Sequence, residues 1–300
     1  TTEIYTLSLH DALPICGIEL SMLLSAVFSI LITTGIVYVL VTEAVPFFRH
    51  VSLWEFLTDR QWTPLFADKH FGILPLLSGT FMTTGIAVVV ALPMGTLIAI
   101  WLSEFARPGV REVVKPILEL LSAVPTVVFG YFAVQLVSPL LQAMFKGTDL
   151  FNMLSAGLVM GVMIVPYVTS LSEDAMRAVP MLLREGSYGM GAGQVTTAFR
   201  VVFPAALSGI GAAYTLALSR AVGETMIVAI AAGMQPNLTW NPLEGAATIT
   251  AYIVQVSMGD LPHGSLEYQT IFAAGITLFA LTLVFNLLSV VLRARYRQAY

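Results

Sequence analysis

Long apolar runs alternate with short polar segments along almost the entire chain. A transmembrane helix needs about 20 mostly apolar residues, and six runs have that length. They extend over residues 20–45, 74–105, 116–141, 153–171, 205–233 and 268–292. The pattern therefore predicts an all-α polytopic membrane protein with six transmembrane helices. A further apolar segment, 246–258, is too short to span and is expected to form a re-entrant or outer-leaflet helix.

Individual residues refine the picture of these spans. Pro93 lies inside the second span and is expected to kink it. Gly157 and Gly161 in the fourth span have a spacing that permits close helix approach, although a Gly-rich span also produces it by chance. Aromatic residues after the first span are expected at a membrane interface; they are Trp54, Phe56, Trp62 and Phe66.

The composition supports a membrane location. Hydrophobic residues make up 57% of the chain and charged residues 11%, whereas a soluble domain carries about 25% charged residues. The formal net charge is −4 and no basic cluster occurs, so no nucleic-acid partner is expected. The single cysteine, Cys16, excludes an intrachain disulfide. The four histidines are scattered without metal-ligand spacing, so no metal site is expected.

The positive charges predict an orientation. Nine of the fourteen Lys and Arg residues lie in segments on one side of the six spans, and the loops on the other side hold four. The three basic segments are 106–116, 172–204 and 293–300. Because cytoplasmic loops carry the excess of Lys and Arg, both termini and the 172–204 loop are expected in the cytoplasm. The predicted location is the bacterial inner membrane, with several passes.

Four parts are expected along the chain. Residues 1–16 lack the positive n-region of a signal peptide, and their stretch YTLSLHDALPI resembles translated sequencing-adapter read-through. This leader is interpreted as an artefact that replaces the native start, with an ordinary polar leader as the alternative. The other parts are the first transmembrane helix and periplasmic loop in 17–73, a five-helix core in 74–292 that contains the loop 172–204, and a cytoplasmic tail in 293–300.

Two opposite charges lie inside the fifth span, in the stretch SRAVGETM. Arg220 and Glu224 are four residues apart, so one continuous helix would place them on the same face. A charge at mid-membrane costs about 2.5–3.5 kcal/mol on insertion scales, so neither is expected to face lipid. They form either a structural ion pair or part of a translocation path. The path is favoured, because a guanidinium binds oxyanions through forked hydrogen bonds. Thr225 adds a hydroxyl.

Two hydroxyl residues flank a proline in the third span. Ser122 and Thr126 are weaker candidates for the path, because Pro125 frees a backbone carbonyl that can line a cavity. Helix packing is the more ordinary explanation. No G-x-x-x-x-G-K-[ST] motif occurs in the chain, so it is expected neither to bind nor to hydrolyse ATP. The chain is therefore interpreted as a transport subunit rather than an enzyme.

The segment 185–204, EGSYGMGAGQVTTAFRVVFP, lies between two membrane-length runs. Its Glu, the Gly six positions later and the closing hydrophobe–proline pair resemble the E-A-A…G…L-P coupling loop of ABC-importer permeases. Small residues occupy the two positions where that loop usually has Ala-Ala. The resemblance implies a helix–turn that presses into a cytoplasmic ATPase. The coupling residues that it implies are Glu185, Gly186, Ser187, Gly191 and Pro204.

SRAVGETM narrows the resemblance to the phosphate-specific ABC permeases of the C-subunit type. In sulfate and molybdate permeases R-A-x-G-E usually continues with Phe, and in A-type phosphate subunits with Ala-Pro. Supporting stretches are 71–80, 91–106 and 115–133. The resemblance implies the type I ABC-importer fold, with inorganic phosphate passing through a path of which this chain forms half. Importers of sulfate or molybdate, and a secondary transporter, are the alternatives.

The same resemblance implies a set of protein partners, in addition to the membrane lipid that surrounds the chain. They are a second, A-type permease chain, a dimer of ATPase subunits that uses ATP and Mg, and a periplasmic or lipid-anchored phosphate-binding protein. The chain itself is expected to carry no cofactor.

Overall fold

The computed structural model describes the backbone of residues 9–296 and the side chains of residues 18–291. Residues 1–8 of the predicted leader and 297–300 of the predicted tail lie outside the described residues. The described chain is helical. Apart from one isolated antiparallel bridge, between Trp62 and Phe71, the described range holds no strand.

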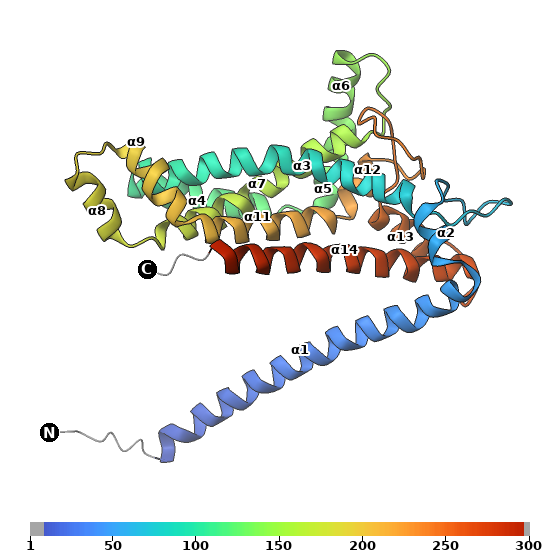
Figure 1. Cartoon of the computed structure of the whole chain (residues 1–300), viewed down its shortest axis with the longest axis horizontal. Coiled ribbons are helices and arrows are strands. Elements are labelled where there is room, and N and C mark those ends of the chain that lie inside the picture. The colour runs from blue at the N-terminus through green and yellow to red at the C-terminus, as the bar shows by residue number, and fades with distance from the viewer. Residues whose placement is uncertain (1–8, 297–300) are drawn as a thin grey trace.

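Four long helices lie side by side and form the body of the molecule (Figure 1). They are α3, Leu74–Ile100, α7, Met153–Arg177, α11, Leu207–Val222, and α14, Leu266–Tyr296. A fifth long helix, α1, Leu9–His50, meets α14 at one end of this bundle and diverges from it along the rest of its length. The short helices α2, Leu53–Thr58, and α13, Ile249–Ser257, lie at that same end, which is called the α2 end below.

The remaining helices lie at the two ends of the bundle or beside its long helices. α8, Met181–Gly189, and α9, Gln194–Thr197, project from the opposite end, called the α8 end (Figure 1). The others are α4, Pro108–Ser122, α5, Thr126–Phe132, α6, Ser138–Met144, α10, Phe203–Ala205, and α12, Met226–Ala231. Three π-helical turns continue α3, α5 and α9; they are η1, Trp101–Phe105, η2, Ala133–Val137, and η3, Ala198–Val202.

Five helical spans in the described chain are long and apolar enough to cross a membrane. Gln194–Ala205 and Leu207–Val222, bent by 69° at their junction, make a sixth if they are taken together. The third span is Thr126–Met144, so the predicted start at residue 116 is wrong. Pro125 causes the difference, because proline disfavours a helical conformation in the residue before it and readily begins a new helix. Residues 116–122 belong to the separate helix α4.

α7 packs closely on α3 through glycines. A Cβ added at Gly157 would lie 2.7 Å from Cβ of Ile86, and one added at Gly161 would lie 2.8 Å from Cβ of Val90. No side chain fits at such distances, so the two glycines allow the backbones to approach. The close helix approach that their spacing predicts is therefore confirmed.

Aromatic side chains form a buried cluster at the α2 end. Trp62 is 1% exposed, and its ring centroid lies 6.1 Å from that of Phe56 and 5.1 Å from that of Tyr252, with edge-to-face geometry. The expectation that Phe56 and Trp62 lie at a membrane interface is therefore wrong. Trp54, in contrast, is exposed. α13 lies beside this cluster and α14, which explains why the short apolar segment 246–258 is largely buried.

Candidate functional site

The fifth apolar run is interrupted where its charges lie. α11 ends at Val222 and α12 begins at Met226, so residues 223–225 are not helical. The carboxylate of Glu224 accepts hydrogen bonds from the backbone N–H groups of Met226, at 3.1 Å, and Ile227, at 3.4 Å. Glu224 is 8% exposed, and its carbonyl accepts a hydrogen bond from Thr250 Oγ1 at 2.7 Å. Its side chain thus satisfies free N–H groups at the start of α12.

Arg220 occupies the last turn of α11 and is exposed on the single chain. Its guanidinium carbon lies 5.7 Å from the ring centroid of Tyr167 on α7, within the range of a cation–π contact. Among the described residues, no ion pair joins it to Glu224 or to another carboxylate. The prediction that Arg220 and Glu224 share one helix face is therefore wrong, because the helix ends between them.

The weaker path candidates lie at the junction between α4 and α5. Ser122 is the last residue of α4 and donates a hydrogen bond to the carbonyl of Glu119 at 2.7 Å. Thr126 is the first residue of α5 and is half-buried. α5 packs closely on α12: a Cβ added at Gly130 would lie 3.0 Å from Ile230 Cδ1. The two candidates thus belong to the segment that neighbours the Glu224 cap. Thr225 donates to the carbonyl of Gly223 at 3.2 Å.

The residues expected in a coupling loop form a compact helix–turn–helix at the α8 end. Gly191 has φ +84°, a conformation that side-chain-bearing residues rarely adopt, and its N–H donates to the carbonyl of Tyr188 at 2.9 Å. Ser187 is buried and its hydroxyl lies 2.9 Å from Thr197 Oγ1, which ties α8 to α9. The remaining expected residues are exposed Glu185 and Gly186 on α8, and Pro204 in the first turn of α10.

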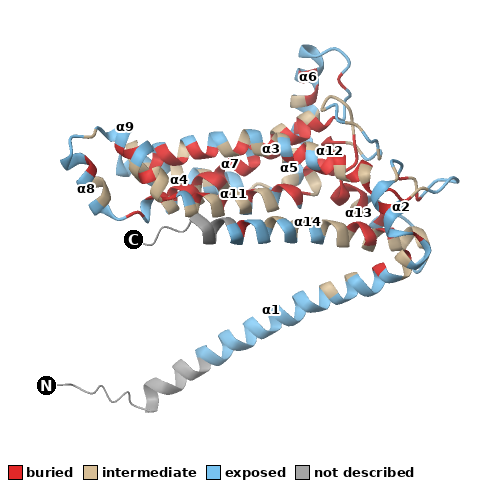
Figure 2. Ribbon diagram, in the orientation of Figure 1, coloured by how far each residue is buried: buried red, intermediate tan, exposed pale blue. Residues whose placement is uncertain are grey.

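This helix–turn–helix carries an exposed apolar surface. Met190 is 86% exposed and Leu182 is 77% exposed. Figure 2 shows α8 and α9 standing clear of the bundle with little covering them. The other large exposed apolar side chains on this surface are Met181, Val195 and Phe199. Large apolar side chains that gather on an exposed segment are typical of an interaction surface.

One salt bridge and two hydrogen bonds of Arg184 fasten the same segment to the bundle. The guanidinium of Arg184 donates to Glu104 Oε1 at 2.9 Å and to the carbonyls of Met176 and Val179 at 3.0 and 2.7 Å. Both side chains of the pair are largely buried. Arg184 therefore joins α8 to η1, which continues α3, and to the end of α7.

A second group of charges, which sequence reasoning missed, lies beside this one. The carboxylate of Glu173 on α7 accepts hydrogen bonds from Arg111, at 2.8 Å, and Lys115, at 2.9 Å, both on α4. Lys115 also contacts Asp174 at 2.6 Å. Burial lowers the pKa of Lys115, but its hydrogen bonds to Asp174 and Glu173 outweigh that effect and raise the pKa above its ordinary value. The sequence signal for this cluster was weak: two basic residues, Arg111 and Lys115, lie four positions apart, and Glu173 follows them by 62 and 58 residues.

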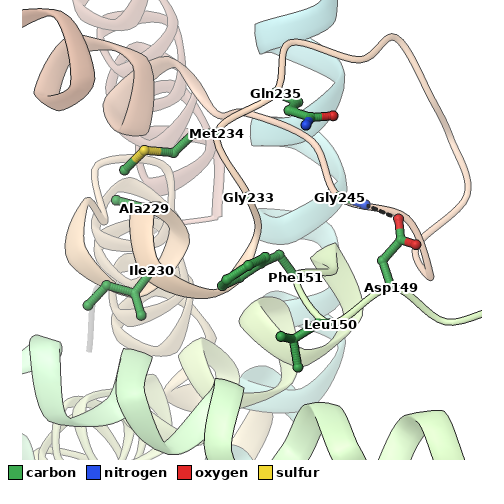
Figure 3. A pocket seen from close by; sticks show the side chains of 9 residues that line it. All are labelled: Asp149, Leu150, Phe151, Ala229, Ile230, Gly233, Met234, Gln235 and Gly245. Atoms are coloured by element: carbon green, nitrogen blue, oxygen red, sulfur yellow. Dashed lines mark hydrogen bonds between the residues drawn. The ribbon is translucent and has the colours of Figure 1, made fainter.

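A cavity lies toward the far end of α12 (Figure 3). Its volume is about 600 Å³. Ala229 and Ile230 of α12 line one part, and the carboxylate of Asp149 lies at another, where it accepts a hydrogen bond from Gly245 N–H at 3.3 Å. The rest of the lining comes from Leu150, Phe151, Gly233, Met234 and Gln235. No cluster of metal-ligating side chains occurs among the described residues.

Residues 91–298 match the family described as binding-protein-dependent transport system inner membrane component. The chain belongs to this family. It is a non-catalytic, multi-pass permease subunit of the bacterial inner membrane, with the type I ABC-importer fold.

Relatives and solved structures agree with this membership. The chain is 37% identical to the probable ABC transporter permease protein YqgH of Bacillus subtilis, over 79% of this chain and 77% of the relative. It is 33% identical to the phosphate transport system permease protein PstC of Mesorhizobium japonicum, over 76% and 75%, and 27% identical to that of Haemophilus influenzae, over 91% and 92%. A bacterial alginate ABC transporter has a similar fold, with a TM-score of 0.63 and 18% identity over 94% of this chain and 95% of that one.

Proposed function

We propose that this chain is the C-type permease subunit of an ATP-driven phosphate importer, in which it forms half of the translocation path. The observation that carries the proposal is Arg220 at the end of α11, beside the helix break at 223–225. The relatives named as phosphate permeases support the substrate, although the 37% identical relative is named only as an ABC permease.

The chemistry of Arg220 suits an oxyanion. Its guanidinium has no carboxylate partner among the described side chains and is accessible on the isolated chain. A second permease chain covering this face would enclose the cation within the membrane. There, the planar fork of donors would bind two oxygens of a passing phosphate. Glu224 does not neutralise this cation, because its carboxylate binds the start of α12.

The α8 end supplies the proposed connection to ATP hydrolysis. We place this end in the cytoplasm, because the basic segment 172–204 contains α8 and α9 and cytoplasmic loops carry the excess of Lys and Arg. The exposed apolar surface of α8 and α9 would dock on one subunit of the ATPase dimer, which uses ATP and Mg. Closure of that dimer would push the segment and switch the path between inward and outward access. The other partners are an A-type permease chain and a periplasmic or lipid-anchored phosphate-binding protein.

A competition experiment tests the substrate. The complex with its cognate partners is reconstituted into proteoliposomes, and uptake of radiolabelled phosphate is measured against an excess of unlabelled phosphate, sulfate or molybdate. We expect only unlabelled phosphate to suppress uptake. Suppression by sulfate or molybdate, or labelled sulfate uptake at a comparable rate, would show that the chain serves another oxyanion. Uptake that persists without the ATPase subunits would indicate a secondary transporter.

A further inference from the structure

The carboxylate of Glu173 is buried within a cluster of cations, and no part of its side chain is exposed. Arg111 and Lys115 of α4 hold its two oxygens, and Arg177 lies 3.9 Å from one of them. The side chain of Asp174, the next residue, is 57% exposed, and among the described residues its carboxylate pairs with Lys115 alone. A buried carboxylate is retained only when cations and hydrogen bonds compensate for its lost hydration. Glu173 is therefore held firmly by α4.

These ion pairs attach a helix that has no fully buried apolar side chain. None of the residues of α4 is buried. Most of its large apolar side chains are exposed, whereas Val114 and Leu118 are partly buried; the exposed ones are Val110, Val113, Ile117, Leu120 and Leu121. Glu173 therefore holds α4 on α7 through two ion pairs, where apolar burial on α4 is only partial.

On one side, the cluster is continuous with the proposed coupling segment. α7 ends at Arg177, four residues after Glu173, and only three residues separate it from α8. Arg184 of α8 donates to the carbonyls of Met176 and Val179. α8 and the end of α7 are thus joined by chain and by hydrogen bonds, so a push on α8 reaches Glu173 directly.

On the other side, the cluster is continuous with the proposed path. α4 leads through Pro125 into α5, and Gly130 of α5 packs against Ile227 and Ile230 of α12. α12 is the helix whose start is capped by Glu224. A displacement of α4 would therefore shift α5 against the helix break.

We propose that Glu173, with Arg111 and Lys115, is the joint that carries movement of the α8 end to the path helices α5 and α12. The three are positioning residues, because none of them contacts substrate in this role. The inference rests on the proposed function, since it needs an ATPase that moves α8.

The test compares the number of phosphate ions transported per ATP hydrolysed in proteoliposomes that contain the complete complex. We expect Glu173→Gln to lower this ratio about 5-fold or more, with ATP hydrolysis retained, because α4 no longer follows α7. Asp174→Asn makes the same change in charge at the neighbouring exposed site and is the matched control, expected to keep the ratio of the wild type. A purely structural role for Glu173 predicts less assembled complex with an unchanged ratio per complex, and that result would overturn the proposal.

Two further variants cover a failure of Glu173→Gln to assemble. Arg111→Gln and Lys115→Gln each leave Glu173 with one strong cation partner, and each is expected to lower the ratio. A ratio equal to that of the wild type in both would also overturn the joint. The wild-type complex separates the two proposals: no phosphate uptake by the wild type contradicts the proposed function, whereas normal uptake with an unchanged ratio in the variants contradicts only the joint.

Discussion

The cap that Glu224 forms on α12 makes a quantitative prediction. Replacing Glu224 with Ala removes the acceptor for two backbone N–H groups, at 3.1 and 3.4 Å, at a site that is 8% exposed. Losing a helix cap costs about 0.5–2 kcal/mol, and a buried donor left without a partner costs about 1–3 kcal/mol. These costs overlap because they describe the same N–H groups, so the expected loss is about 1–3 kcal/mol in the local stability of α12.

Amide hydrogen exchange of the complex measures this loss where it occurs. A local opening that becomes easier by about 1–3 kcal/mol speeds exchange about 5- to 150-fold, and the effect should be confined to the first turn of α12. Glu224→Gln keeps an acceptor without its charge and should show a smaller increase, because charge-assisted hydrogen bonds are about twice as strong. Glu119→Ala removes an exposed carboxylate from α4 and is the control. Unchanged exchange at Met226 and Ile227 in Glu224→Ala would refute the cap.

Three other predictions follow from the structure. Gly191→Val should abolish ATPase stimulation by the binding protein while the chain still inserts, since φ +84° is strained for a branched residue. Gly186→Ala changes an open helix surface and should leave the stimulation intact. Stimulation retained in both variants would contradict the turn's role. Gly157→Leu should separate α7 from α3 and lower the thermal stability of the complex, whereas Gly85→Leu has free space around it; equal melting temperatures would contradict the close packing. The hydrogen bond to Asp59 raises the pKa of His70, so the stabilisation of loop 59–71 should be complete below pH 6.5 and be lost as pH rises through the raised pKa. Amide exchange in this loop, corrected for the intrinsic rate, should therefore be slower at low pH, and this pH dependence should disappear in His70→Gln. A pH dependence that persists in His70→Gln would exclude His70 as its cause.

Continuous apolar runs without internal breaks were predicted well from the sequence. α3 and α7 cover the predicted second and fourth spans, and α7 extends beyond the prediction to Arg177. The reason is that apolar length alone decides whether a helix spans a bilayer. The Gly157 spacing was also informative, because close helix packing needs small residues at a fixed interval.

Breaks inside an apolar run were not predicted. Gly223 and Glu224 interrupt the fifth span. In a sequence, however, one glycine and one carboxylate occur in continuous helices as well as in broken ones, so they do not tell the two apart. The cap on α12 decides the matter, and it depends on where the Glu224 side chain folds back. Pro125 did carry a signal for the start of α5, and the apolar residues on both sides of it concealed the break.

Ion pairs between residues far apart in the sequence could not be predicted from it. Glu173 and Arg111 are separated by 62 residues, and both were assigned to loops because charges usually mark the ends of spans. Only the packing of α4 on α7 brings them together. The turn between α8 and α9 lies in a segment that the local pattern singled out, and Gly191 at positive φ gives the glycine there a physical reason; the role of its residues in coupling stays a prediction.

Phosphate uptake by Arg220 variants is the most direct test that Arg220 lies in the phosphate path. The initial rate of uptake into proteoliposomes is measured for the wild-type complex, Arg220→Gln, Arg220→Lys and the control Lys146→Gln, an exposed cation in a loop. We expect uptake to be abolished in Arg220→Gln and to recover little in Arg220→Lys, because an ammonium cannot reproduce the planar fork. The control should transport normally, and all four complexes should assemble. Wild-type uptake by assembled Arg220→Gln would contradict the assignment of Arg220 to the phosphate path.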